Sequence, residues 1–138
     1  IGVGLVGSEM CIRDSRMARD FTYIDDIVEG VLRVLAKPAT AAEGFDAAQP
    51  DPATSWAPHR VFNIGNSAPT PLLEFIAALE SALGREAIQH LEPMQPGDVE
   101  ATAADTAALE AWVGFRPATP MVEGVAAFAD WYRQFYGC

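Results

Sequence analysis

The spacing of apolar residues along the chain predicts three main helices. The first runs from Asp25 or Asp26, as its N-cap, to about Ala36. The second runs over residues 71–83 and the third over about 120–136. Because residues three or four positions apart share one helix face, each helix should bury one stripe. The expected stripes are Ile27, Val31, Val34 and Leu35; Leu72, Ile76, Leu79 and Leu83; and Val122, Val125, Ala129, Tyr132 and Tyr136.

Short runs of β-branched and aromatic residues predict strands at Phe21–Ile24, Val61–Ile64 and Ala87–Leu91. A short helix, capped by Asp105, should continue through Trp112. Residues 38–60 show no apolar periodicity, so they predict a long surface loop. Strands that alternate with helices indicate an α/β fold with parallel pairing. Two or three strands are few for an independent sheet, so the sheet should be incomplete.

Composition indicates one globular domain. The chain has 138 residues, of which 50% are apolar and 20% charged. Its net charge is −10 and its nine basic residues are scattered, which argues against nucleic acid as a partner. A small anion could still bind where one arginine is aimed at it. Arg19, beside the first predicted strand, is the leading candidate for that contact.

The cysteines and histidines do not form a recognisable site. Cys11 and Cys138 lie near opposite ends, and His59 and His90 stand alone, so neither a disulfide framework nor a metal site is expected. No run approaches the roughly 18 apolar residues of a membrane span, so no membrane partner is expected. With no targeting segment recognised, we expect a cytoplasmic protein.

The first fifteen residues form a segment of their own. Gly2, Gly4 and Gly7 match the spacing G-x-G-x-x-G, which holds a dinucleotide only after a strand and before a helix. One residue precedes Gly2, so we do not interpret the match as a cofactor loop. The stretch from Leu5 to Ser15 is similar to a read-through tail that recurs in assembled environmental sequences. We therefore expect residues 1–15 to be a non-native tail and residues 16–138 to be the protein itself.

Three stretches in a fixed order point to a function. They are Arg-Asp-Phe-Thr-Tyr-Ile-Asp-Asp-Ile-Val-Glu-Gly at 19–30, Ala-Pro-His-Arg-Val-Phe-Asn-Ile-Gly-Asn at 57–66, and Met-Gln-Pro-Gly-Asp-Val at 94–99. Together they resemble the C-terminal part of NAD-dependent nucleotide-sugar epimerases and dehydratases, which are extended short-chain dehydrogenases/reductases with a Rossmann-like fold. The resemblance covers about Arg16 to Tyr136.

The resemblance implies a role for several residues. Arg19 would contact the pyrophosphate of a UDP-sugar through paired, charge-assisted hydrogen bonds. Asp98 would accept hydrogen bonds from the ribose hydroxyls. Gln95 would also face the diphosphate, at a position where many relatives carry a second arginine. Asn63 and Gly65 are interpreted as structural. Enzymes of this family oxidise a sugar hydroxyl to a keto group with bound NAD and return the hydride to the other face.

The chain departs from the family in its catalytic half. The general base of the family lies in Tyr-x-x-x-Lys, and the only lysine here, Lys37, follows Arg33 by four positions. The glycine-rich NAD loop is missing as well. We therefore assign no catalytic, cofactor-binding or metal-binding residue, and expect NAD to be bound by a missing N-terminal half. The chain alone should be inactive, and the complete enzyme should be a homodimer.

Within this family, residues 94–99 and the loop at 51–58 resemble the glucuronate-type enzymes. The resemblance therefore implies UDP-glucuronate as the substrate, converted to UDP-galacturonate through a 4-keto intermediate. One alternative is another nucleotide-sugar epimerase, dehydratase or decarboxylase. Others are a nucleotide-binding module without catalysis and a structural or interaction protein. If half the fold is missing, the helices that begin near Asp26 and Pro71 should leave apolar faces partly exposed.

Overall fold

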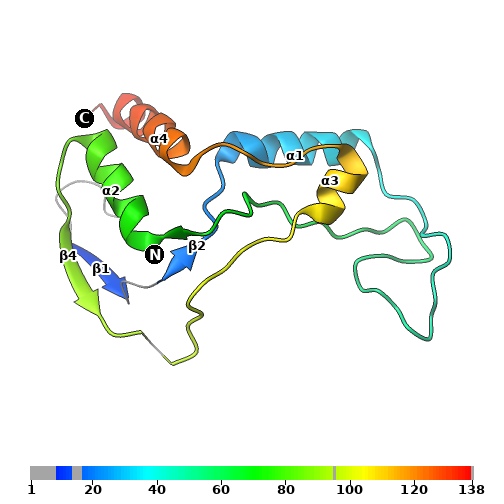
Figure 1. Ribbon diagram of the computed structural model, residues 1–138. Coiled ribbons are helices and arrows are strands. Elements are labelled where there is room, and N and C mark those ends of the chain that lie inside the picture. The colour runs from blue at the N-terminus through cyan, green and yellow to red at the C-terminus, as the bar shows by residue number, and fades with distance from the viewer. Residues whose placement is uncertain (1–8, 14–16, 95, 138) are drawn as a thin grey trace.

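Four helices carry most of the regular structure in the residues described by this computed structural model, which are 9–13, 17–94 and 96–137. They are α1 (Ile24–Ala36), α2 (Leu72–Leu83), α3 (Ala107–Val113) and α4 (Met121–Tyr136). All four were predicted from the sequence. Figure 1 shows α2 and α4 at one end of an elongated molecule, with the long loop at the other end and α1 and α3 in between.

The strands form two separate pairs. β1 (Glu9–Arg13) runs parallel to β4 (Ile88–Glu92), with Glu9 opposite Ile88. β2 (Ala18–Arg19) runs antiparallel to β3 (Thr70–Pro71). The strand expected at 87–91 is therefore confirmed as β4, and the fold is α/β with an incomplete sheet. The segment predicted to be a non-native tail contributes β1, whose backbone pairs along the whole of β4.

Two predicted strands are wrong. Residues 21–23 are irregular and Ile24 already belongs to α1, while residues 61–66 form no strand. A strand needs a partner for its backbone groups, and these runs contribute side-chain contacts instead. The Phe21 ring stacks on Phe75 at 3.9 Å, and the Phe62 ring lies 6.3 Å from that of Trp112. Their aromatic content thus reflects packing in loops.

The N-cap prediction for α1 is also wrong. The cap residue is Tyr23, and it makes no side-chain capping bond. Asp26 lies inside the first turn, where its Oδ2 accepts hydrogen bonds from the amides of Ala118 (3.2 Å) and Thr119 (2.9 Å). This carboxylate therefore fixes the chain that leads into α4 instead of capping its own helix.

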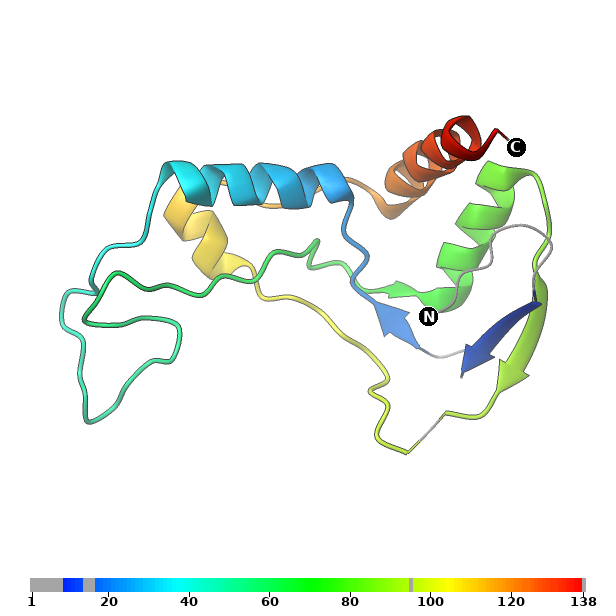
Figure 2. The same ribbon diagram turned by 180° about the vertical axis from the view of Figure 1, so that it is seen from behind.

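The core lies mainly between α2 and α4, which are side by side in both views (Figures 1 and 2). Ile76 and Leu79 of α2 are buried, as are Val125 and Ala129 of α4. The stripe predicted for α2 is confirmed, since Leu72 and Leu83 are half-buried beside them. Leu109 of α3 is fully buried.

The stripes predicted for α1 and α4 are wrong in part. Val31 and Leu35 of α1 are 52% and 73% exposed, and Val122 and Tyr136 of α4 are both 61% exposed. The periodicity marks the apolar face correctly, but the described part of the chain places no sheet against it. The expectation that helix faces remain exposed is confirmed for α1, and on α2 Leu73 is 38% exposed.

We expect the isolated chain to self-associate through the apolar face of α1. Leu35→Lys should lower the apparent mass measured by light scattering at high concentration, because it places a charge at a site that is 73% exposed. The midpoint of thermal unfolding should change little, since Leu35 contributes little to the core. A wild-type chain that is a monodisperse monomer at all concentrations would contradict this expectation.

The C-terminal end of α1 is tied to α3. Lys37 Nζ donates to the carbonyl of Trp112 (2.6 Å), and Trp112 Nε1 donates to the carbonyl of Lys37 (3.0 Å). The Arg60 guanidinium lies 4.3 Å from the centre of the Trp112 ring. The predicted loop at 38–60 contains no helix or extended strand, and it returns to the body of the molecule at this cluster (Figure 2).

Candidate functional site

The strand β2 lies between two other segments. On one side Ala18 and Arg19 pair with β3, and the amide of Leu72 donates to the carbonyl of Met17 (2.8 Å). On the other side the amide of Ala18 donates to the carbonyl of Glu100 (2.9 Å), and the amide of Thr102 donates to Ala18 (3.3 Å). β2 therefore holds residues 100–102 at a fixed position beside Arg19.

Arg19 lies at the end of β2 and is half-buried. Its Nη1 donates to the carbonyls of Ala18 (2.8 Å) and of Glu100 (3.3 Å), which is 81 residues away in sequence. These bonds direct the guanidinium along the segment that follows Asp98. A guanidinium has five N–H donors in a planar fork, so it can donate to an anion as well.

Asp98 lies in the exposed segment that follows a turn at Pro96 and Gly97, where Gly97 has a φ of 95°. Asp98 precedes Glu100 by two positions, so the structure brings the predicted pyrophosphate and ribose contacts into one region. Gln95, the third predicted site residue, lies outside the described residues. The roles assigned to all three stay predictions.

Asp20 is a residue of this region that the sequence analysis did not single out. Its Oδ2 accepts hydrogen bonds from the amides of Ser67 (3.0 Å) and Ala104 (3.1 Å), and its Oδ1 accepts one from Ala68 (3.3 Å). One signal was available in the sequence. Asp20 follows Arg19 directly but precedes the first residue of α1 by four positions, too far for a helix cap.

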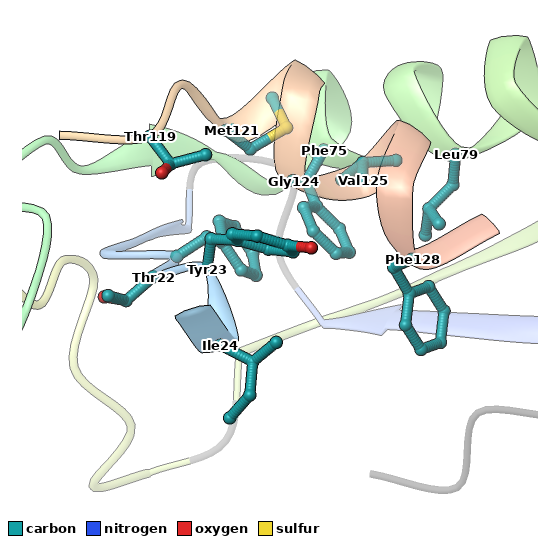
Figure 3. A pocket seen from close by; sticks show the side chains of 11 residues that line it. Thr22, Tyr23, Ile24, Phe75, Leu79, Thr119, Met121, Gly124, Val125 and Phe128 are labelled. Carbon is teal, nitrogen blue, oxygen red and sulfur yellow. The ribbon is translucent and has the colours of Figure 1, made fainter. Parts of the chain in front are cut away.

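An apolar cavity of about 390 Å³ lies where the chain enters α1. Figure 3 shows Tyr23, Phe75 and Phe128 around it, with Met121 and Val125 of α4 above. The Tyr23 ring packs on α4 at Gly124, where a Cβ would lie 3.1 Å from Tyr23 Cδ2. The lining offers few polar groups, so this cavity does not suit a charged nucleotide.

The Tyr23 hydroxyl does not act as a base at neutral pH. Partial burial, and then the charge of Asp25 and a hydrogen bond to it, raise the pKa of Tyr23 above its ordinary value. The group therefore stays protonated. Ile27 occupies the place, four positions later, where the family motif would have lysine. Tyr23 thus does not replace the missing Tyr-x-x-x-Lys.

The described part of the chain contains neither a metal-binding cluster nor a membrane-spanning helix. No group of three or more histidine, cysteine, aspartate or glutamate side chains there could hold a metal ion. Among the helices of the same residues, none is both long enough and apolar enough to cross a bilayer.

Several known proteins match this chain over most of its length. No protein-family model matches the chain. Protein CapI of Staphylococcus aureus is 46% identical over 120 residues, which cover 87% of this chain and 36% of that protein. A probable UDP-glucuronate 4-epimerase of Rhizobium meliloti is 43% identical over 127 residues, covering 89% of this chain and 36% of the relative.

A solved structure agrees with these sequences. The UDP-glucuronic acid 4-epimerase of Bacillus cereus, in complex with UDP-glucuronic acid and NAD, superposes with a TM-score of 0.68 at 26% identity, over 93% of this chain. The predicted resemblance is confirmed. The chain is homologous to UDP-sugar epimerases of the extended short-chain dehydrogenase/reductase family. It spans about a third of the length of the curated relatives it matches, and its fold is that of their C-terminal part.

Proposed function

We propose that the chain is the substrate-binding C-terminal part of an NAD-dependent UDP-sugar epimerase that interconverts UDP-glucuronate and UDP-galacturonate. The observation that carries the proposal is the hydrogen bond from Arg19 to the carbonyl of Glu100. Arg19, the residue expected to bind the pyrophosphate, therefore lies beside the segment that contains Asp98. The choice of substrate is supported by the R. meliloti relative at 43% identity. It is supported also by the B. cereus enzyme, whose structure contains UDP-glucuronic acid.

Arg19 and Asp98 would contact different parts of the nucleotide. Arg19, the only charged residue of β2, would donate to the diphosphate oxygens with the planar fork that suits phosphate. Asp98 would accept from the ribose hydroxyls, and Gln95 would offer the diphosphate a neutral amide. Fewer positive charges at the diphosphate than in relatives with two arginines should make binding less sensitive to salt.

The described residues do not fit NAD. A dinucleotide pyrophosphate is held by a glycine-rich turn at the start of a helix. The helices α1, α2 and α4 instead begin after Tyr23, Pro71 and Pro120. NAD would therefore be bound by the part of the enzyme that this chain does not span, and no oxidation step is assigned to the residues here. That the complete enzyme is a homodimer, and that residues 1–15 are a non-native tail, stay predictions from the sequence.

Binding of UDP tests the proposal. We expect UDP to bind the 138-residue chain, and Arg19→Ala to weaken binding about tenfold or more, because a charge-assisted contact contributes about 1.5–3 kcal/mol. The measurement is isothermal titration calorimetry. Arg85→Ala is the matched control, since Arg85 is an exposed arginine just beyond the end of α2.

The outcomes separate the candidate functions. Equal UDP affinity for Arg19→Ala and Arg85→Ala, or no UDP binding by the wild type, would overturn the assigned site. Binding of UDP should not lead to turnover of UDP-glucuronate by this chain, even with NAD added. Turnover would show that the catalytic groups are present here after all.

A further inference from the structure

The carboxylate of Asp20 joins three segments that are far apart in sequence. Its three hydrogen bonds run to Ser67 and Ala68 in one turn and to Ala104 in another segment, 84 residues away. All three partners are backbone amides. A charged acceptor makes such bonds stronger than a neutral one, so this half-buried group is a firm anchor.

The turn that Asp20 holds is closely packed and strained. Ser67 has a φ of 54°, a left-handed conformation that is uncommon for residues other than glycine. Its Oγ donates to the carbonyl of Ala104 (2.8 Å) and lies 3.1 Å from Thr106 Oγ1. At Gly65, a Cβ would lie 2.4 Å from the Cβ of Ala104. The turn and the Ala104 segment are therefore in close contact, and Asp20 bonds to the backbone of both.

Asp20 also bonds to the segment that follows Asp98. Ala101 forms a bridge with Ala18, and Glu100 accepts a bond from Arg19, so the chain from Asp98 to Ala104 is held at two points. One point is β2 and the other is Asp20. Arg19 and Asp20 therefore contact the same segment, Arg19 at the carbonyl of Glu100 and Asp20 at the amide of Ala104.

We propose that Asp20 is a positioning residue of the UDP site: it holds the segment that carries Asp98 at the correct distance from Arg19 without touching the nucleotide. The proposal rests on the proposed function. In the ligand-free chain, loss of the carboxylate should let residues 100–104 open from β2 more often, although the backbone bonds of Ala18 remain.

Amide hydrogen exchange tests this claim without ligand. In Asp20→Asn, one carboxylate oxygen becomes an amide group that faces a backbone N–H. We expect exchange to become at least about tenfold faster at Ser67 and Ala104, and also at Thr102, whose amide bonds to Ala18. The amide of Ala129 in the core should not change. Asp46→Asn is the control, because Asp46 accepts a hydrogen bond from the backbone amide of Ala48 within its own loop.

A double-mutant cycle tests the effect on binding, with Kd measured on the folded population by NMR titration. Asp20→Asn should weaken the binding of UDP about tenfold in the wild-type background. It should weaken binding less than about twofold when Asp98 is already alanine, because the effects of coupled residues are not additive. Rescue by Asp20→Glu, even in part, is also expected. Full additivity, or unchanged exchange at Thr102 in Asp20→Asn, would overturn the proposal. If the wild type binds no UDP, the proposed function fails and the exchange rates alone decide about Asp20.

Discussion

Ile76→Ala is expected to lower the free energy of unfolding by about 2–5 kcal/mol, the range for truncating a buried aliphatic side chain. Ile76 is only 1% exposed and lies on the face of α2 that packs against α4. Domains are stable by about 5–15 kcal/mol in total, and this one leaves several apolar side chains of α1 in contact with water. The variant should therefore lose a large share of its stability and unfold at a clearly lower urea concentration.

Urea denaturation, monitored by circular dichroism, measures this loss of stability. Ile88→Ala is the matched control, because it removes the same atoms from β4, where Ile88 is 59% exposed. Its free energy of unfolding should stay within about 0.5 kcal/mol of the wild-type value. Similar midpoints for the two variants would mean that the packing of α2 against α4 does not hold the chain together.

The helices could be predicted because their signals are local. The apolar spacing marked each helix, and Gly84 ends α2 in a left-handed conformation with a φ of 66°, as a glycine after a helix commonly does. The cap predicted at Asp105 is wrong by one residue, because the cap residue of α3 is Thr106, but Asp105 still lies beside the helix start, where its Oδ1 accepts a hydrogen bond from the amide of Ala107. Each of these signals involves residues within about one helical turn of each other.

The strands and the buried faces were harder to predict because they depend on distant partners. A strand at residues 61–64 would need a neighbour to pair with, and none of the described residues provides it. Val31 and Leu35 have the spacing of a buried stripe, yet both are more than half exposed. Periodicity shows which face is apolar, whereas burial also requires something to cover that face.

The candidate site shows the same division. Arg19 and Asp98 were identified from motifs, but no local rule could show that Arg19 contacts Glu100. Asp20 was missed because its three partners all lie more than 40 residues away. The glycine at position 65 was interpreted as structural, and the close approach of Ala104 and Asp20 gives that interpretation a physical reason.

Gly65→Ala should disrupt the site as well as the fold. Its Cβ would lie 2.4 Å from the Cβ of Ala104 and 2.8 Å from Asp20 Oδ2, distances at which backbone or side chain must move. We expect a loss of roughly 3 kcal/mol in the free energy of unfolding, at the upper end of the usual range for overpacked positions. UDP affinity of the remaining folded molecules should fall together with it, because Ala104 is pushed away from the Asp20 anchor.

The control for this variant is Gly44→Ala in the long loop. Gly44 has a φ of 75° and no atom within 4 Å of a Cβ at that place, so alanine would cost only the left-handed conformation, about 1–2 kcal/mol. It should leave the affinity for UDP unchanged. If Gly65→Ala kept both wild-type stability and wild-type affinity, the turn at 65–68 could not be fixed against Ala104, and the anchoring role of Asp20 would fail with it.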